Sequence, residues 1–259
     1  MSSRSSAPRD DQSAAAVADS VQRRWPRRPQ RLATAVTEDL VGQIVGGELP
    51  AGSVLPIESV LCEMFAVSRT VIREAVKSLE GMRLVTIQQG SGTTVNDEED
   101  WDLIDPVVLS AFIQHDAERA ILEDLVEVRS MLESQMAGQA ATRADEEQIE
   151  RIRVALEGVY AVEGVPTLFV HADLEFHYAV MAASGNRLGR AVVQTINSQA
   201  FHSLRYLGEP SREDFRDANI AHQAVFDSIK VRDGRGASDA MAEHITDSWR
   251  RRRPDTQVR

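Results

Sequence analysis

One carboxylate and three imidazoles in the C-terminal half of the chain form a candidate metal-binding set. Asp173 and His177 lie four residues apart in the segment Asp-Leu-Glu-Phe-His, and His222 and His244 follow later in the sequence. If that segment is helical, the first two side chains emerge from the same helix face about one turn apart. The four together would suit zinc or another first-row divalent ion, with coordination positions left open for water or a small acid.

Spacing alone leaves other interpretations open. An Asp and a His four residues apart on a helix commonly share a local hydrogen bond, and distant histidines need not converge. Of the remaining histidines, His115 falls in a polar stretch and His171 on a different helix face from Asp173, so we expect both at the surface. His202 is compatible with lining a cavity, with packing or with facing solvent.

An open metal site with these ligands could also activate water, which makes a metal-dependent hydrolase the main alternative function. The sequence shows no independent nucleophile, glycine-rich phosphate loop or clear paired general acid to accompany the site. We therefore expect a protein that is not an enzyme and that has no catalytic residues.

A row of positive side chains marks a second segment, residues 69–80. Arg69, Arg73 and Lys77 recur at every fourth position, with Thr70 beside them, opposite the apolar face of the predicted helix. Such a stripe is commonly a solvated surface. In the second helix of a helix-turn-helix, however, it would lie where the major groove of DNA is contacted.

The helices before this segment are predicted from apolar periodicity. Leu32 begins a stripe that repeats at every fourth residue and is closed by Gly46-Gly47, which predicts one helix. Residues 58–65 predict a second, short helix. Ser68 then precedes the segment 69–80 and is the expected N-cap of that third helix.

Two β-branched runs follow, at residues 84–87 and 93–95, on either side of Gln-Gln-Gly-Ser-Gly. They predict a small hairpin. Three helices followed by a hairpin describe a winged helix-turn-helix, which places the positive stripe on its recognition helix.

Beyond an acidic stretch near residue 100, the sequence shows helical patterns and little that resembles a strand. We therefore predict a mainly α protein, in which a C-terminal all-α antiparallel helical bundle follows the winged helix. The helices expected in the bundle are 105–114, 119–142, 145–162, 166–184, 187–207, 211–232 and 236–252. The expected parts are a disordered basic tail (1–29), the DNA-binding domain (30–96), a linker (97–105), the helical domain (106–253) and a tail (254–259).

Composition supports two folded domains. The chain has 259 residues, of which 42% are hydrophobic and 27% charged. Its longest apolar runs are too short to span a bilayer and its N-terminus lacks an apolar secretory core, so we expect no membrane contact. Cys62, the single cysteine, cannot form an internal disulfide and is expected to be a small buried side chain. These features lead us to expect a cytoplasmic, nucleoid-associated protein.

The net charge of −11 is unevenly distributed. Residues 1–96 carry 11 Lys/Arg and 10 Asp/Glu (+1), which leaves 18 and 30 (−12) for residues 97–259. The acidity therefore belongs to the C-terminal part and does not exclude nucleic acid as a partner of the N-terminal part. Five arginines between residues 23 and 31 form either a solubilising tail or an arm that contacts DNA phosphates.

The N-terminal domain resembles that of GntR-type regulators. The likeness rests on the sequences at 55–59, 65–75 and 84–95, and it covers essentially all of residues 32–95. The chain departs from the pattern at Ser59, where proteins of the FadR branch often have an arginine, so a DNA contact could be missing there. The residues that match DNA-contacting positions of that branch are Ser68, Arg69, Thr70, Arg73, Gln89 and Gly90.

Residues 173–186 resemble the metal-binding helix of the FCD domain, the ligand-binding half of FadR-branch regulators. His222 and His244 fall on segments where that domain supplies its other ligands. The resemblance implies a divalent ion, zinc first and nickel or manganese as alternatives. It also implies that Arg129 holds the carboxylate of an effector, although an intrahelical pair with Glu133 is the other interpretation of that arginine.

The sequence therefore predicts a homodimeric transcription regulator, a repressor, that binds inverted-repeat operator DNA and responds to a small carboxylic acid at a metal site. Residues 101–109 resemble the linker of galactonate-operon regulators, which hints at a sugar acid. The remaining alternative, beside the hydrolase, is an architectural DNA-binding protein whose metal is purely structural.

Overall fold

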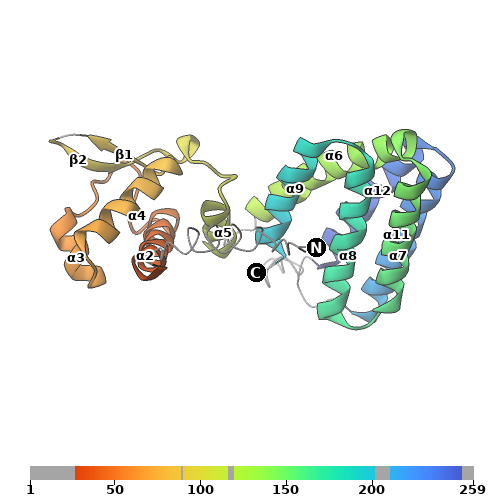
Figure 1. The fold of residues 1–259 in the computed structure, drawn as a ribbon, viewed down its shortest axis with the longest axis horizontal. Coiled ribbons are helices and arrows are strands. Elements are labelled where there is room, and N and C mark those ends of the chain that lie inside the picture. The colour runs from red at the N-terminus through yellow and green to blue at the C-terminus, as the bar shows by residue number, and fades with distance from the viewer. Residues whose placement is uncertain (1–26, 89, 116–119, 202–210, 253–259) are drawn as a thin grey trace, which may run out of the picture.

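The computed structural model describes residues 27–88, 90–115, 120–201 and 211–252. It confirms the predicted fold class: a winged helix-turn-helix is followed by an all-helical domain (Figure 1). Residues 1–26 and 253–259 fall outside the described residues, and with them most of the predicted N-terminal tail (1–29) and all of the predicted C-terminal tail (254–259), as does His202. The first helix of the described residues begins at Arg27, inside the segment expected to be tail, and Pro29 falls in its first turn, where a missing N–H breaks no helical hydrogen bond.

The N-terminal unit is built around two helices that pack against each other, α2 and α4. Its elements are α2 (Arg27–Val45), α3 (Glu58–Phe65), α4 (Arg69–Gly81), β1 (Val85–Gln88) and β2 (Gly92–Val95). The strands pair antiparallel, with Val85 opposite Val95 and Gln88 opposite Gly92. The turn between α3 and α4 is made by Ala66 in the left-handed conformation. Leu32, the first residue of the predicted stripe, is 44% exposed, so the buried stripe starts one turn later, at Val36.

The C-terminal unit consists of α5 (Pro106–His115), α6 (Ala120–Arg143), α7 (Glu146–Ala161), α8 (Pro166–Ala183), α9 (Arg187–Ala200), α11 (Arg212–Lys230) and α12 (Gly234–Arg252). Local sequence signals explain where several of these helices begin. Asp145 and Ser211 each form a capping box, and Pro166 occupies the first turn of α8. The bounds of these helices lie within two residues of the predicted ones, except that α9 ends at Ala200, whereas a helix over 187–207 was predicted.

Small residues bring α6 and α12 close together. A Cβ atom built on Gly138 would lie 2.8 Å from the Gly234 carbonyl oxygen, so a larger side chain would force the helices apart. The helices α11 and α12 also pack against each other, and α6 packs against α8. Four helices thus surround the region in which the predicted metal ligands lie.

One helix belongs to both units. Figure 1 shows α5 between α2 and the bundle, where it packs against α2 on one side and α9 on the other. Val108 and Ala111 are buried in the core of the N-terminal unit, whereas Leu109 and Ile113 are buried in the core of the bundle. Trp101, within the predicted linker, is buried in the N-terminal core and donates its indole N–H to the Asn96 carbonyl. The segment between the units is therefore packed in place.

Candidate functional site

The four predicted metal ligands come together inside the bundle. Asp173 and His177 lie on α8, His222 on α11 and His244 on α12, and one ligand atom from each lies within 4.8 Å of the other three. Donors that bind one ion at about 2.0–2.2 Å are separated by up to about 4.4 Å. The observed spacing is only slightly wider than such a ligand shell.

The imidazole contacts fit a cation between these groups. Nε2 of His177 lies 3.2 Å from Nε2 of His244, and Nε2 of His222 lies 3.2 Å from Oδ1 of Asp173. Two neutral imidazole lone pairs repel each other unless a proton or a metal lies between them. In the described part of the chain, Nε2 of His222 faces the Asp173 carboxylate without a hydrogen bond of good geometry, and Nδ1 of His222 and Nδ1 of His244 are buried without a hydrogen-bond partner. A buried nitrogen that faces a carboxylate in this way is what a ligand set leaves open for an ion.

Burial sets the protonation state of the ligands. It lowers the pKa of His222, although the neighbouring Asp173 carboxylate opposes the shift, and it lowers the pKa of His244 well below its ordinary value. Burial works in the opposite direction on Asp173, but contact with His222 and the nearby histidines outweighs it and lowers the pKa of that carboxyl. These shifts favour neutral imidazoles at His222 and His244 and an ionised carboxylate at Asp173, the forms that bind a metal.

A second buried carboxylate orients one of the ligands. Nδ1 of His177 donates to Oε2 of Glu133 at 2.5 Å, so Nε2 is left as the ligating nitrogen. Burial would raise the pKa of Glu133, but the Arg129 guanidinium and His177 overcome this and lower it to about 2. Sequence reasoning named Glu133 only as a partner of Arg129. Its contact with His177 joins positions 44 residues apart, for which the sequence holds no signal.

Arg129 lies in the wall of the same site. Its Nε donates to Oε1 of Glu133 at 2.7 Å, and its guanidinium carbon lies 5.2 Å from the centre of the Phe201 ring. Only 2% of the residue is exposed. The intrahelical pair is thus present, and it joins Arg129 through Glu133 to a metal ligand.

The predicted DNA-contacting residues form an exposed surface on α4. Ser68, Arg69, Thr70 and Arg73 are all exposed, while Val71, Ile72, Ala75 and Leu79 of the same helix are buried. Gly90, at the tip of the hairpin, is exposed with a φ of 85°, a conformation that favours glycine. Gln89 lies outside the described residues.

Two details differ from the expected DNA-binding helix. Ser68 occupies the N-cap position, but its side chain makes no capping hydrogen bond, so the hydroxyl is available to another partner. Arg73 is paired with Glu58 of α3, its Nε lying 2.9 and 3.1 Å from the two carboxylate oxygens. This contact lowers the pKa of Glu58 and holds Arg73 at the surface of the helix-turn-helix.

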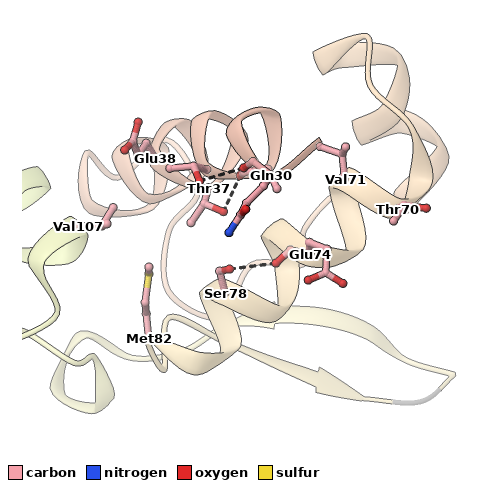
Figure 2. A pocket seen from close by; sticks show the side chains of 11 residues that line it. Gln30, Thr37, Glu38, Thr70, Val71, Glu74, Ser78, Met82 and Val107 are labelled. Atoms are coloured by element: carbon pink, nitrogen blue, oxygen red, sulfur yellow. Dashed lines mark hydrogen bonds between the residues drawn. The ribbon is translucent and has the colours of Figure 1, made fainter. Parts of the chain in front are cut away.

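A hollow of about 490 Å³ lies between α2 and α4 (Figure 2), and Thr70, one of the predicted DNA-contacting residues, lies at its edge. The hydroxyls of Thr34, Thr37 and Ser78 in its wall donate to carbonyl oxygens of their own helices. Glu38 and Glu74, which also line it, would repel an anion. The hollow is therefore a poor site for a carboxylic acid, in contrast to the site near Arg129.

The two histidines expected at the surface, His115 and His171, are exposed as predicted. Cys62 is only partly buried, at the edge of the N-terminal core. In the described parts of the chain, no helix has both the length and the apolar character that crossing a bilayer requires.

Comparison with known proteins gives two family matches. Residues 32–95 match the family described as bacterial regulatory proteins, gntR family, and residues 124–247 match the FCD domain. The chain is 32% identical over 211 residues to the galactonate operon transcriptional repressor of Escherichia coli K12, which covers 81% of this chain and 91% of that protein. It is 29% identical over 207 residues to the HTH-type transcriptional regulator LutR of Bacillus subtilis, covering 78% and 93%.

Among solved structures, the fold resembles Lar, described as controlling the expression of the Listeria monocytogenes agr system. The TM-score is 0.53 at 19% identity, over 84% of this chain and 96% of that one. The families matched are regulators of transcription rather than enzymes.

Proposed function

The chain belongs to the gntR family of bacterial regulatory proteins and carries an FCD domain, and we propose that a small carboxylic acid, bound at a metal ion in that domain, sets its affinity for operator DNA. It is a DNA-binding transcription regulator. The metal, the effector, its action as a repressor and its cytoplasmic location are parts of the proposal.

The convergence of Asp173, His177, His222 and His244 carries this proposal. An ion held by them would act as a Lewis acid toward an incoming carboxylate or hydroxyl oxygen. Zinc suits one carboxylate and three imidazoles best, and nickel and manganese are the alternatives.

Arg129 provides a fixed positive charge beside this site. Its fork geometry suits two carboxylate oxygens, and its pairing with Glu133 restrains the side chain before an acid arrives. The galactonate operon repressor suggests which acid to try first, because its name refers to a sugar acid. It also supports the proposal that this chain represses transcription.

We propose that the exposed face of α4 and the tip of the hairpin contact the operator DNA. The residues are Ser68, Arg69, Thr70, Arg73, Gln89 and Gly90. We propose that the protein is a homodimer and binds an inverted repeat, since a two-fold protein matches a two-fold operator.

The shared helix α5 supports coupling between the two units. Since its residues belong to both cores, a rearrangement of the bundle would move the surface on which α2 rests. An effector can shift the equilibrium only if it binds the two arrangements with different affinity, and the coupling is then reciprocal.

A thermal-shift screen followed by a gel shift tests the proposal. Protein loaded with zinc, nickel or manganese is heated with a panel of hydroxy acids and sugar acids, and a ligand that binds the native state raises the Tm by mass action. The acid found is then added to the protein–operator complex, where we expect release. Metal-dependent melting without any response to acids would instead indicate an architectural protein with a structural metal.

A further inference from the structure

Asn197 on α9 is a buried polar side chain whose hydrogen-bonding capacity is largely unused. Only 1% of the residue is exposed, and in the described part of the chain its amide forms no hydrogen bond of good geometry, although the Tyr178 hydroxyl lies close enough to interact with it. Burying an unpaired amide costs free energy, so such a residue needs an explanation. The buried amide of Asn219 on α11, by contrast, donates to Glu163, and it is the oxygen of that amide that lacks a partner among the described residues.

The surroundings of Asn197 connect it to the proposed effector site. One turn farther along α9 lies Phe201, whose ring faces the Arg129 guanidinium at 5.2 Å. The hydroxyl of Tyr178, which follows the ligand His177 in sequence, lies in the same neighbourhood. Burial raises the pKa of that phenol, while its hydrogen-bonding interaction with Asn197 and the charge of Arg129 act to lower it. One hydroxyl cannot use both the donors and the acceptor of the Asn197 amide.

Apolar side chains also lie beside Asn197 along α9. Val193, one turn before Asn197 on the same helix, packs with Met136 and Met181, and Tyr178 packs against this group. A ligand lying along α9 would therefore contact the neutral amide of Asn197, which can both donate and accept a hydrogen bond. Arg129 would lie on one side of this contact and the apolar side chains on the other. A hydroxyl group, which also both donates and accepts, is the complementary partner.

We propose that Asn197 is a ligand-contacting residue that recognises a hydroxyl on the carbon chain of the effector, so that the site prefers a polyhydroxylated carboxylic acid. This inference rests on the proposed function, since it needs the carboxylate group of the same ligand to be held by Arg129 and the metal site. It adds a structural reason for an acid with several hydroxyl groups and the residue that selects it.

The test compares acids that share the group bound at the metal. D-Galactonate, D-gluconate and other six-carbon aldonates each carry a 2-hydroxy acid group, as does 2-hydroxyhexanoate, which lacks the further hydroxyls. Titration of zinc-loaded protein should show that the best aldonate binds about tenfold more tightly than 2-hydroxyhexanoate, the difference expected for a hydroxyl paired in a buried site. In Asn197→Leu this ratio should fall to about one, with the affinity for 2-hydroxyhexanoate kept.

Stability provides a second measurement. Because the amide is poorly paired in the free protein, Asn197→Leu should raise the Tm of ligand-free protein by about 2–4 °C. A structural role for Asn197 predicts the reverse. Gln139→Leu is the matched control: it removes another buried, unpartnered amide oxygen, on α6, and should leave the preference for aldonates unchanged.

The outcomes are distinguishable. If wild-type protein binds no acid of either kind, the proposed function fails, and this inference fails with it. If acids bind but aldonates have no advantage, or if Asn197→Leu keeps that advantage, the assignment of Asn197 is overturned while the effector site stands.

Discussion

Nδ1 of His177 lies 2.5 Å from Oε2 of Glu133, and both side chains are almost completely buried. This contact fixes the imidazole with its Nε2 toward His222, His244 and Asp173. A carboxylate in this position also makes the imidazole a better ligand.

Glu133→Gln should therefore weaken zinc binding about 10- to 100-fold, because a neutral amide oxygen accepts more weakly from His177 than a carboxylate and does not raise the basicity of the imidazole as a negative charge does. Competition with a chromophoric chelator measures the affinity. Glu147→Gln, which alters an exposed carboxylate paired with Arg151 on α7, is the control and should bind zinc as the wild type does. Equal zinc affinity in both variants would show that Glu133 does not support zinc binding.

Arg69→Ala and Arg73→Ala should each weaken operator binding by about tenfold or more, as expected for loss of a bidentate contact to a base. Both side chains are exposed, so thermal unfolding should be unchanged. Arg153→Ala, on an exposed face of α7, is the matched control. Gel shifts showing unaltered operator affinity in both α4 variants would contradict the assigned DNA-contacting face.

Glu58→Gln tests the pairing seen at Arg73. Removing the carboxylate releases Arg73 and removes one negative charge from the DNA-facing side, so affinity for nonspecific DNA should rise. The salt dependence of binding should become steeper. Weaker nonspecific binding would indicate that Glu58 serves instead to position Arg73 for DNA.

Ile113→Ala should weaken the effect of the acid on operator binding, because Ile113 anchors α5 in the bundle core. We expect a loss of about 2–5 kcal/mol in the free energy of unfolding. Ile152→Ala removes the same volume from the bundle core, on α7, and should cost a similar amount while leaving the response to acid intact. Equal responses in the two variants would argue against transmission through α5.

Much of the fold was predictable because its signals are local. Capping residues such as Asp145 and Ser211, and the proline at the start of α8, fix helix starts by contacts within a few residues. The positions of the four metal ligands were predicted largely from family resemblance, because spacing alone places only Asp173 and His177 on one face.

The remaining features depend on tertiary packing. The burial of Trp101, the two-sided packing of α5 and the contact between Glu133 and His177 each join residues that sequence periodicity does not relate. Asn197 is similar: in sequence it is one polar residue on an amphipathic helix, and only the packed structure shows its amide buried and poorly paired.

The most direct test is effector-driven release of operator by a variant that cannot hold the metal. The His177→Ala, His222→Ala double variant should lose zinc, measured by elemental analysis, and should bind operator in gel shifts without being released by the acid that releases wild-type protein. His171→Ala, an exposed histidine on the same helix, should keep both zinc and the response. Normal acid-driven release by the metal-free double variant would contradict the account.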